Sequence, residues 1–188
     1  MKPLFISYWT SGPYEEYGRR LVKSLSKHMV DFDYVITPRV AFSGWIQACA
    51  YKANVIKEFL ITKQPRPIVW LDADATVEQY PSLFFELDCD VAARFFNGDR
   101  QVGHLGSGTL YFANNARVMQ IMNDWLEVLV KNPKMLDQDG LHQSLRMHPD
   151  AVIHELPPEY NFIFDTDKAE FPSLKPVILQ HQASRKHR

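Results

Sequence analysis

Two aspartates separated by one small residue are the clearest candidates for chemistry in this chain. Asp72 and Asp74 flank Ala73, and they follow a short apolar run at 68–71 that comes after Gln-Pro-Arg-Pro. This run predicts a buried strand that ends at the two carboxylates. A turn that begins at Ala73 lets both converge on one cation, and a divalent ion would keep both ionised despite their repulsion. The alternative is a plain turn in which the aspartates hydrogen-bond the backbone.

A second group of candidates lies at the end of the first predicted strand, over residues 4–8. Tyr8, Trp9 and Thr10 lead into a Ser-Gly-Pro loop. Ligands collect at the carboxyl ends of parallel strands in α/β folds, so this loop is a candidate donor-binding segment. The rings of Tyr8 and Trp9 either stack on a nucleobase or fill the edge of the sheet.

Three further segments carry candidate ligand contacts. Lys52 is predicted among the exposed residues of a helix over 45–61, where it either reaches a diphosphate or stays solvated. Ser107 and Gly108 belong to a Gly-Ser-Gly segment before a strand, and its glycines indicate close approach of a ligand or a tight bend. The polar segment 97–103 is predicted as a loop over an active site.

The order of the predicted elements places these candidates in one fold class. Strands over 4–8, 32–36 and 68–71 alternate with amphipathic helices over 14–28 and 45–61. This alternation predicts an α/β, Rossmann-like fold with a mostly parallel central sheet flanked by helices. Later strands are expected over 90–96, 109–112, 151–155 and 176–180, and later helices over 80–85, 115–129 and 137–145.

Length, composition and charge limit the classes of function. At 188 residues with 46% hydrophobic residues, the chain is expected to form a single domain over 1–188. A net charge of −1 gives no global field for nucleic acid or an anionic membrane. No run approaches the roughly 20 apolar residues of a membrane span. Cys49 and Cys89 match no paired metal spacing, and without a secretory signal they are expected to be reduced thiols in a cytoplasmic protein.

The ordered motifs resemble the GT-A nucleotide-diphospho-sugar glycosyltransferases, most closely the retaining group of glycogenin and bacterial lipopolysaccharide galactosyltransferases. The resemblance covers nearly the whole chain. It rests on Leu-Asp-Ala-Asp-Ala at 71–75, Gly-Ser-Gly at 106–108, Asp-Gln-Asp at 137–139, Leu-Pro-Pro-Glu-Tyr-Asn at 156–161, and a terminal strand that ends in His181.

The resemblance implies a metal site and a nucleotide donor. By this similarity Asp74 and His181 bind the ion, while Asp72 meets the ion or the ribose of the donor. Two carboxylates, an imidazole and diphosphate oxygens complete a roughly six-coordinate Mn²⁺ or Mg²⁺ site. Such an ion offsets the charge on the leaving nucleoside diphosphate, for which the resemblance implies UDP.

The resemblance also implies residues at the sugar. Asp137-Gln138-Asp139 is similar to the segment beneath the donor sugar, so Gln138 and Asp139 are the implied catalytic residues, with Asp137 alternatively a helix cap. Retention of configuration follows from the resemblance alone. If the enzyme inverts, Asp139 or Asp99 is the candidate general base.

The C-terminal segment departs from the pattern of the group. The resembled proteins carry His-x-x-Gly-x-x-Lys, whereas Ser184 replaces the glycine here and Lys186 comes one residue early. A cation remains useful beside the leaving diphosphate, so Arg185 or Lys186 is expected to bind the donor.

Two other functions fit the same aspartates. The Asp-Ala-Asp-Ala-Thr-Val segment at 72–77 also suits a haloacid-dehalogenase-like phosphohydrolase with Asp72 as nucleophile, and the fold suits a non-catalytic nucleotide- or metal-binding module. That phosphohydrolase family usually carries the motif on its first strand, whereas two strand-helix units precede it here. For a transferase the acceptor stays open: a saccharide, a protein, a small molecule or a hydroxylated DNA base.

Overall fold

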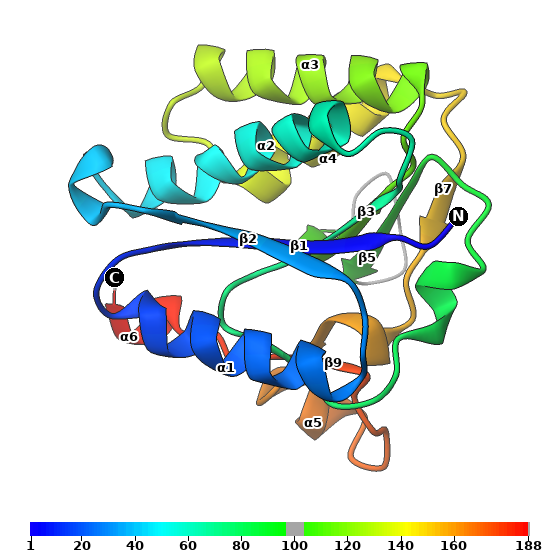
Figure 1. Cartoon of the computed structure of the whole chain (residues 1–188). Helices are drawn as coiled ribbons and strands as arrows, with labels where there is room; N and C mark the ends of the chain where they lie inside the picture. Colours follow the sequence, from blue (N-terminus) through cyan, green and yellow to red (C-terminus); the bar gives the residue numbers. More distant parts are fainter. Residues whose placement is uncertain (97–103, 188) are drawn as a thin grey trace.

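A six-stranded sheet forms the centre of the protein in a computed structural model that describes residues 1–96 and 104–187 (Figure 1). Its strand order is β2-β1-β3-β6-β5-β7, with β1 at Leu4–Thr10, β2 at Phe32–Thr37, β3 at Ile68–Leu71, β5 at Val91–Phe96, β6 at His104–Phe112 and β7 at Ile153–Glu155. The pairs β1·β2, β1·β3 and β5·β7 are parallel, and β6 runs antiparallel to both its neighbours. The predicted α/β fold with a mostly parallel sheet is confirmed. The predicted loop at 97–103, with Asp99, lies outside the described residues.

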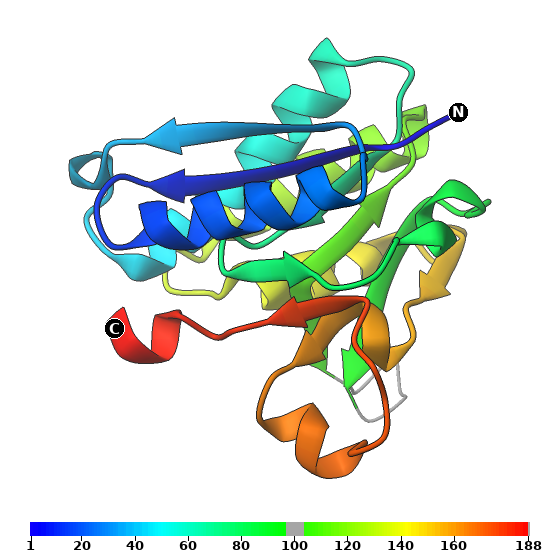
Figure 2. The ribbon, with the colours of Figure 1, turned by 60° about the horizontal axis from the view of Figure 1, so that its bottom comes forward.

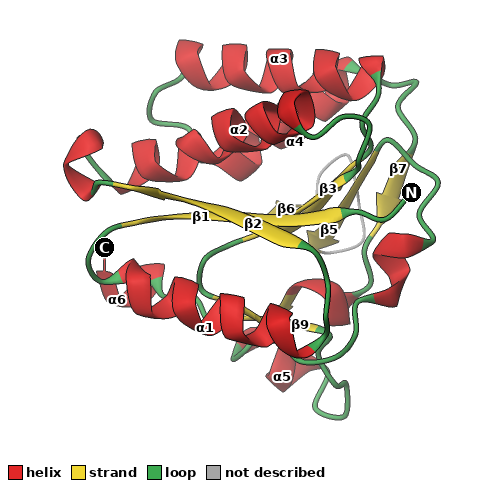
Figure 3. Cartoon of the chain, in the orientation of Figure 1, coloured by secondary structure: helices red, strands yellow, loops and turns green. Residues whose placement is uncertain are grey.

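Helices cover both faces of this sheet (Figure 3). Helix α1 (Tyr14–Lys27) lies on one face, and α2 (Trp45–Thr62), α3 (Ala116–Lys131) and α4 (Asp137–Met147) lie on the other. Because side chains alternate along a strand, Ile6 packs with the three-helix layer while Phe5 packs on the α1 side. Every residue of β1 is buried, as expected for a strand covered on both faces. None of the described helices is long and apolar enough to cross a membrane.

A second, three-stranded sheet was not predicted, and it brings the C-terminal segment to the aspartates (Figure 2). Its order is β4-β9-β8, with β4 at Ala75–Val77, β8 at Phe162–Ile163 and β9 at Ile178–Gln180. Strand β9 is the predicted final strand in shorter form, and it pairs with β4 directly after Asp74. Short helices complete the chain: α5 at Thr166–Glu170, α6 at Ser184–His187, and 3₁₀ turns η1 at Arg39–Ala41, η2 at Ser82–Phe85 and η3 at Pro158–Asn161.

A side-chain cap marks the start of α3 but not that of α4. The Asn115 side chain accepts a hydrogen bond from the Val118 N–H at 2.9 Å, which confirms the predicted cap of α3. Helix α4 begins at Asp137 without a side-chain cap, so the alternative that Asp137 is a helix cap is wrong. The glycines of the Gly-Ser-Gly segment lie within β6 rather than at a bend that precedes it.

Candidate active site

A cavity of about 500 Å³ opens at the carboxyl ends of β1 and β3. The predicted site residues in its lining are Tyr8, Trp9, Thr10, Lys52, Asp72, Asp74, Ser107, Gly108, Gln138 and Arg185. Asp139 and His181 are not among the residues that line it. Lys186 lies in α6, and its side chain falls outside the described part of the chain. The fold thus gathers residues from distant segments at the place where α/β sheets usually bind ligands.

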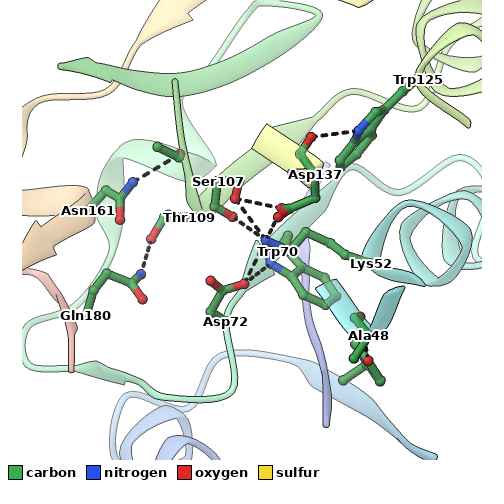
Figure 4. A network of polar contacts seen from close by, with 12 residues as sticks. Ala48, Lys52, Trp70, Asp72, Ser107, Thr109, Trp125, Asp137, Asn161 and Gln180 are labelled. Atoms are coloured by element: carbon green, nitrogen blue, oxygen red, sulfur yellow. Dashed lines mark hydrogen bonds and ion pairs between the residues drawn. The ribbon is translucent and has the colours of Figure 1, made fainter. Parts of the chain in front are cut away.

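Lys52 stands at the centre of a buried charged network (Figure 4). Its Nζ lies 2.9 Å from Asp72 Oδ1 and 2.7 Å from Asp137 Oδ2, and it donates to Ser107 Oγ at 3.0 Å. Ser107 Oγ in turn donates to Asp137 Oδ2 at 2.7 Å. Lys52 is only 4% exposed, so its predicted place among the exposed residues of the helix is wrong. The helical spacing could have indicated this burial, because Lys52 shares a face of the helix with Cys49, Ala53 and Ile56.

The charges of this network hold the lysine in its protonated form. Burial lowers the pKa of Lys52, but the nearby charges of Asp137 and Asp72 outweigh it and raise the pKa above its ordinary value. Trp70 donates its indole N–H to the same Asp72 Oδ1 at 2.9 Å. One carboxylate oxygen of Asp72 is therefore fixed by an ammonium and an indole.

Asp74 is partly buried, and its side chain forms no ion pair with the lysines and arginines that the structure describes. Its Oδ2 accepts a hydrogen bond from the Ala183 N–H at 2.5 Å, and its backbone oxygen accepts one from the His181 N–H at 3.3 Å. Burial, and secondly the charge of Asp72, raise the pKa of Asp74 to about 6. The two carboxylates line one cavity and supply oxygen donors, which suits a hard divalent cation.

His181, the third predicted metal ligand, has its ring turned toward Thr76. The Thr76 hydroxyl donates to Glu78 Oε1 at 2.6 Å and lies 2.9 Å from His181 Nε2. Because a hydroxyl has one proton to donate, His181 Nε2 is the donor to Thr76. Within the described ranges, no three His, Cys, Asp or Glu side chains come close enough together to hold a metal. The structure brings Asp72 and Asp74 together but does not join the His181 ring to them.

The predicted catalytic pair is split by the helix that carries it. Gln138 lines the cavity, whereas Asp139 is exposed and lies beside a separate surface depression with His142, Gln143 and Arg146. Asp137, which the sequence did not single out as a site residue, is the buried member of the motif. The apolar stripe of α4 could have identified it, because Asp137 is one turn from the buried Leu141.

Two buried amides line the other side of the cavity, and neither was predicted as a site residue. Asn161 Nδ2 donates to Gly106 O at 3.1 Å, and Gln180 Nε2 donates to Thr109 Oγ1 at 2.9 Å. A Cβ on Gly106 would lie 2.6 Å from Asn161 Nδ2, and one on Gly108 would lie 2.8 Å from Gln180 Cδ. Both glycines therefore make room for an amide.

The aromatic residues at the end of β1 act in packing. Tyr8 donates its hydroxyl to Ala48 O at 2.6 Å. Trp9 stacks on Tyr34 with ring centroids 4.7 Å apart, and it packs so closely on Gly18 that a Cβ there would lie 2.4 Å from the ring. Of the two predicted alternatives, filling the edge of the sheet is therefore seen for Trp9, although both rings also border the cavity.

The C-terminal segment places one cation at the rim. Arg185 lines the cavity and forms an ion pair with Asp165, the residue that caps α5. Hydrogen bonding by the Thr166 N–H and by Arg185 outweighs the opposite effect of burial and holds the pKa of Asp165 below its ordinary value. Arg185 is therefore already paired with a carboxylate at the rim of the cavity.

Comparisons with known proteins identify the family of the chain and solved structures with a similar fold. A model of the nucleotide-diphospho-sugar transferase family matches residues 42–187. A search of curated proteins finds no match. Among solved structures, the chain is similar to a glycosyltransferase involved in the glycosylation of the major capsid of PBCV-1, with a TM-score of 0.71, 12% identity and coverage of 100% of this chain and 98% of that one.

Two further structures share the fold. GlyE of Streptococcus pneumoniae TIGR4 gives a TM-score of 0.64 at 19% identity, and the similarity covers 96% of this chain but 54% of GlyE. Mouse xyloside xylosyltransferase 1 gives 0.61 at 11% identity, with coverage of 98% and 99%. At these identities the similarity shows the fold.

Proposed function

The chain belongs to the nucleotide-diphospho-sugar transferases, and from this premise we propose that it moves a sugar from a UDP-linked donor to a hydroxyl acceptor with the help of a divalent ion. It is a glycosyltransferase by family. The observation that carries the finer proposal is the presence of Asp72 and Asp74 in one cavity of about 500 Å³, a size that suits a small-molecule ligand.

Charge supports the proposed ion. Three carboxylates, Asp72, Asp74 and Asp137, line this cavity together with the ammonium of Lys52, while the guanidinium of Arg185 at the rim is already paired with Asp165. A diphosphate adds further negative charge, so its binding here calls for additional positive charge. We assign Asp72 and Asp74 to hold Mn²⁺ or Mg²⁺. The backbone of His181 lies beside Asp74, but its ring contacts Thr76, so His181 as the third ligand, which the resemblance implies, requires the ring to turn toward the aspartates. When bound, the ion would offset charge on the leaving nucleoside diphosphate.

The chain's own residues have separate proposed roles around the donor. Lys52 holds a fixed positive charge between Asp72 and Asp137, and Ser107 and Gly108 border the same space. Gln138 borders the cavity from α4, which supports its assignment to the sugar and the reaction centre. Asp139 faces away from the cavity, so we assign it no contact with the donor. Arg185 is the cation proposed to meet the diphosphate at the rim.

The proposal is tested by incubating the protein with Mn²⁺ and a panel of nucleotide sugars. We expect release of nucleoside diphosphate. We also expect Asp74→Asn to lower the rate by at least about 100-fold, while Glu58→Gln, an exposed carboxylate on α2, changes little. Full activity of Asp74→Asn, with an unchanged metal requirement, would sink the proposed site. Phosphate release from a simple ester would instead favour the phosphohydrolase, and binding without turnover would favour the non-catalytic module.

The stereochemistry, acceptor and location belong to the same proposal. We propose retention of configuration, which analysis of the anomeric product by NMR checks. A mass increase in one of several candidate acceptors (a saccharide, a protein, a small molecule or DNA) identifies the class of acceptor. Neither Cys49 nor Cys89 forms a disulfide in the structure, which supports a cytoplasmic location. Fractionation of the source cells tests that location, and recovery of the protein outside the cytoplasm would refute it.

A further inference from the structure

Among the described residues, the buried amide of Gln180 on β9 forms only one of the four hydrogen bonds that an amide side chain can make. Gln180 is 2% exposed and lines the cavity, and its Nε2 donates to Thr109 Oγ1 at 2.9 Å. Among the described residues, no hydrogen bond is made to its Oε1. Figure 4 shows this oxygen turned away from Thr109, toward the side of the view on which Asp72 lies. Among the described residues, Oε1 is not one of the fully buried side-chain atoms that lack a partner, so this oxygen is open to the cavity, where a ligand or water can supply the donor.

The position of this amide is set from several directions. The backbone of Gln180 pairs with Ala75 of β4 on one side and with Ile163 of β8 on the other. Its side chain lies over Gly108, where an added Cβ would approach Oε1 to 3.0 Å and Cδ to 2.8 Å. A larger residue at 108 would displace the amide, so β6 is shaped to admit it.

The chemistry of an amide selects the group it can bind here. A phosphate oxygen carries no proton to donate, so it gains nothing from Oε1. In the orientation that the structure shows, with Nε2 donating to Thr109, a hydroxyl can donate to Oε1. A sugar offers several hydroxyls at fixed positions, and a buried, fixed acceptor can distinguish them.

We propose that Gln180 is a specificity-determining residue that accepts a hydrogen bond from a hydroxyl of the sugar in the nucleotide-sugar donor. Thr109 acts as a positioning residue, because its hydroxyl holds the amide nitrogen. This inference rests on the proposed transferase function and adds to it the residue that selects the sugar. It involves no covalent step and no proton transfer.

The test compares two ligands in one variant by isothermal titration calorimetry with Mn²⁺ present. UDP reports on the nucleotide and the ion, whereas UDP-glucose and UDP-galactose report on the sugar as well. We expect Gln180→Met to bind UDP like the wild type but to bind the preferred UDP-sugar about 5- to 10-fold more weakly, as expected for one lost hydrogen bond. The preference between the two epimeric sugars should also shrink.

Three further variants complete the design. Gly108→Ala should reproduce the selective loss by displacing the amide, and Thr109→Val should give a smaller one. Gln143→Met, the same substitution on the exposed side of α4, should change neither ligand. Thermal unfolding midpoints identify variants that fail to fold, and titration with Mn²⁺ alone should give the same affinity for Gln180→Met and the wild type.

The possible results separate the two proposals. An equal weakening of UDP and UDP-sugar, or weaker binding of Mn²⁺ alone, would show that Gln180 acts on the nucleotide or the ion and would overturn this inference. Unchanged binding of every ligand in a folded Gln180→Met protein would also overturn this inference. A wild type that binds neither UDP nor any UDP-sugar would refute the proposed function itself, and this inference with it.

Discussion

Strand β6 separates two polar regions that are built on different principles. On one side, Ser107 contacts the charged network of Lys52 and Asp137. On the other side, Gly106 and Gly108 lie against the neutral amides of Asn161 and Gln180. The charged side needs every partner to be present, because a buried charge without its counter-charge is costly. The neutral side needs space, because each amide occupies the volume that a side chain on β6 would fill.

The largest expected effect comes from removing the single cation of the charged side. Lys52→Met leaves the buried carboxylate of Asp137 without its counter-charge, and we expect the free energy of unfolding to fall by about 3–5 kcal/mol. Chemical denaturation measures this loss. Lys23→Met on the exposed face of α1 serves as the control, with an expected change within about 0.5 kcal/mol. A Lys52→Met protein as stable as the wild type would mean that the network is not held by charge.

The neutral side should respond to volume instead. Gly106→Ala places a Cβ 2.6 Å from Asn161 Nδ2 and 2.9 Å from a ring carbon of Phe96, so we expect a loss of about 1–3 kcal/mol from overpacking. Denaturation again measures it. At Gly44 an added Cβ meets no atom within 4 Å, so Gly44→Ala should cost less. If the two alanine variants were equally stable, the claim that β6 needs glycine for the amides would fail.

The smallest effect is expected at the rim of the cavity, where an ion pair is exposed to solvent. Asp165→Asn keeps a side-chain oxygen to cap α5 but removes the charge that pairs with Arg185. Because both side chains are exposed by more than a third, we expect a change in stability below about 1 kcal/mol. Freed from its partner, Arg185 should bind UDP slightly more tightly, which titration calorimetry would detect. Weaker UDP binding in Asp165→Asn would contradict this assignment of Arg185.

The sequence predicted what depends on local pattern. The apolar run before Asp72 and the alternation of strands and helices were enough to place the aspartates at the end of β3 in an α/β sheet. The spacing of apolar residues also predicted α2 and α3, with the cap at Asn115. These features depend on residues a few positions apart, which a single sequence displays directly.

What the sequence did not predict depends on distant partners. Lys52 was taken as exposed because lysine usually is. Its helical spacing indicated the buried face, but the counter-charges that allow its burial come from Asp72 after β3 and Asp137 of α4, which are distant in the sequence. The small sheet was missed because β4 has three residues and pairs with a strand far along the chain. The reason for glycine at 106 and 108 lies in the amides of η3 and β9, which no local rule connects to β6.

The pairing of β4 with β9 has a consequence for how the protein folds. The hydrogen bond from Ala183 to Asp74 joins residues 109 positions apart, so closing this contact costs more chain entropy than forming the neighbouring strands of the central sheet. We therefore expect the C-terminal wall of the cavity to form late and to open first. Native-state hydrogen exchange should show faster exchange at Ala183 than at Val69 in β3. The enzyme would then gain its donor site in the final folding step, and partial opening would abolish activity before the central sheet unfolds.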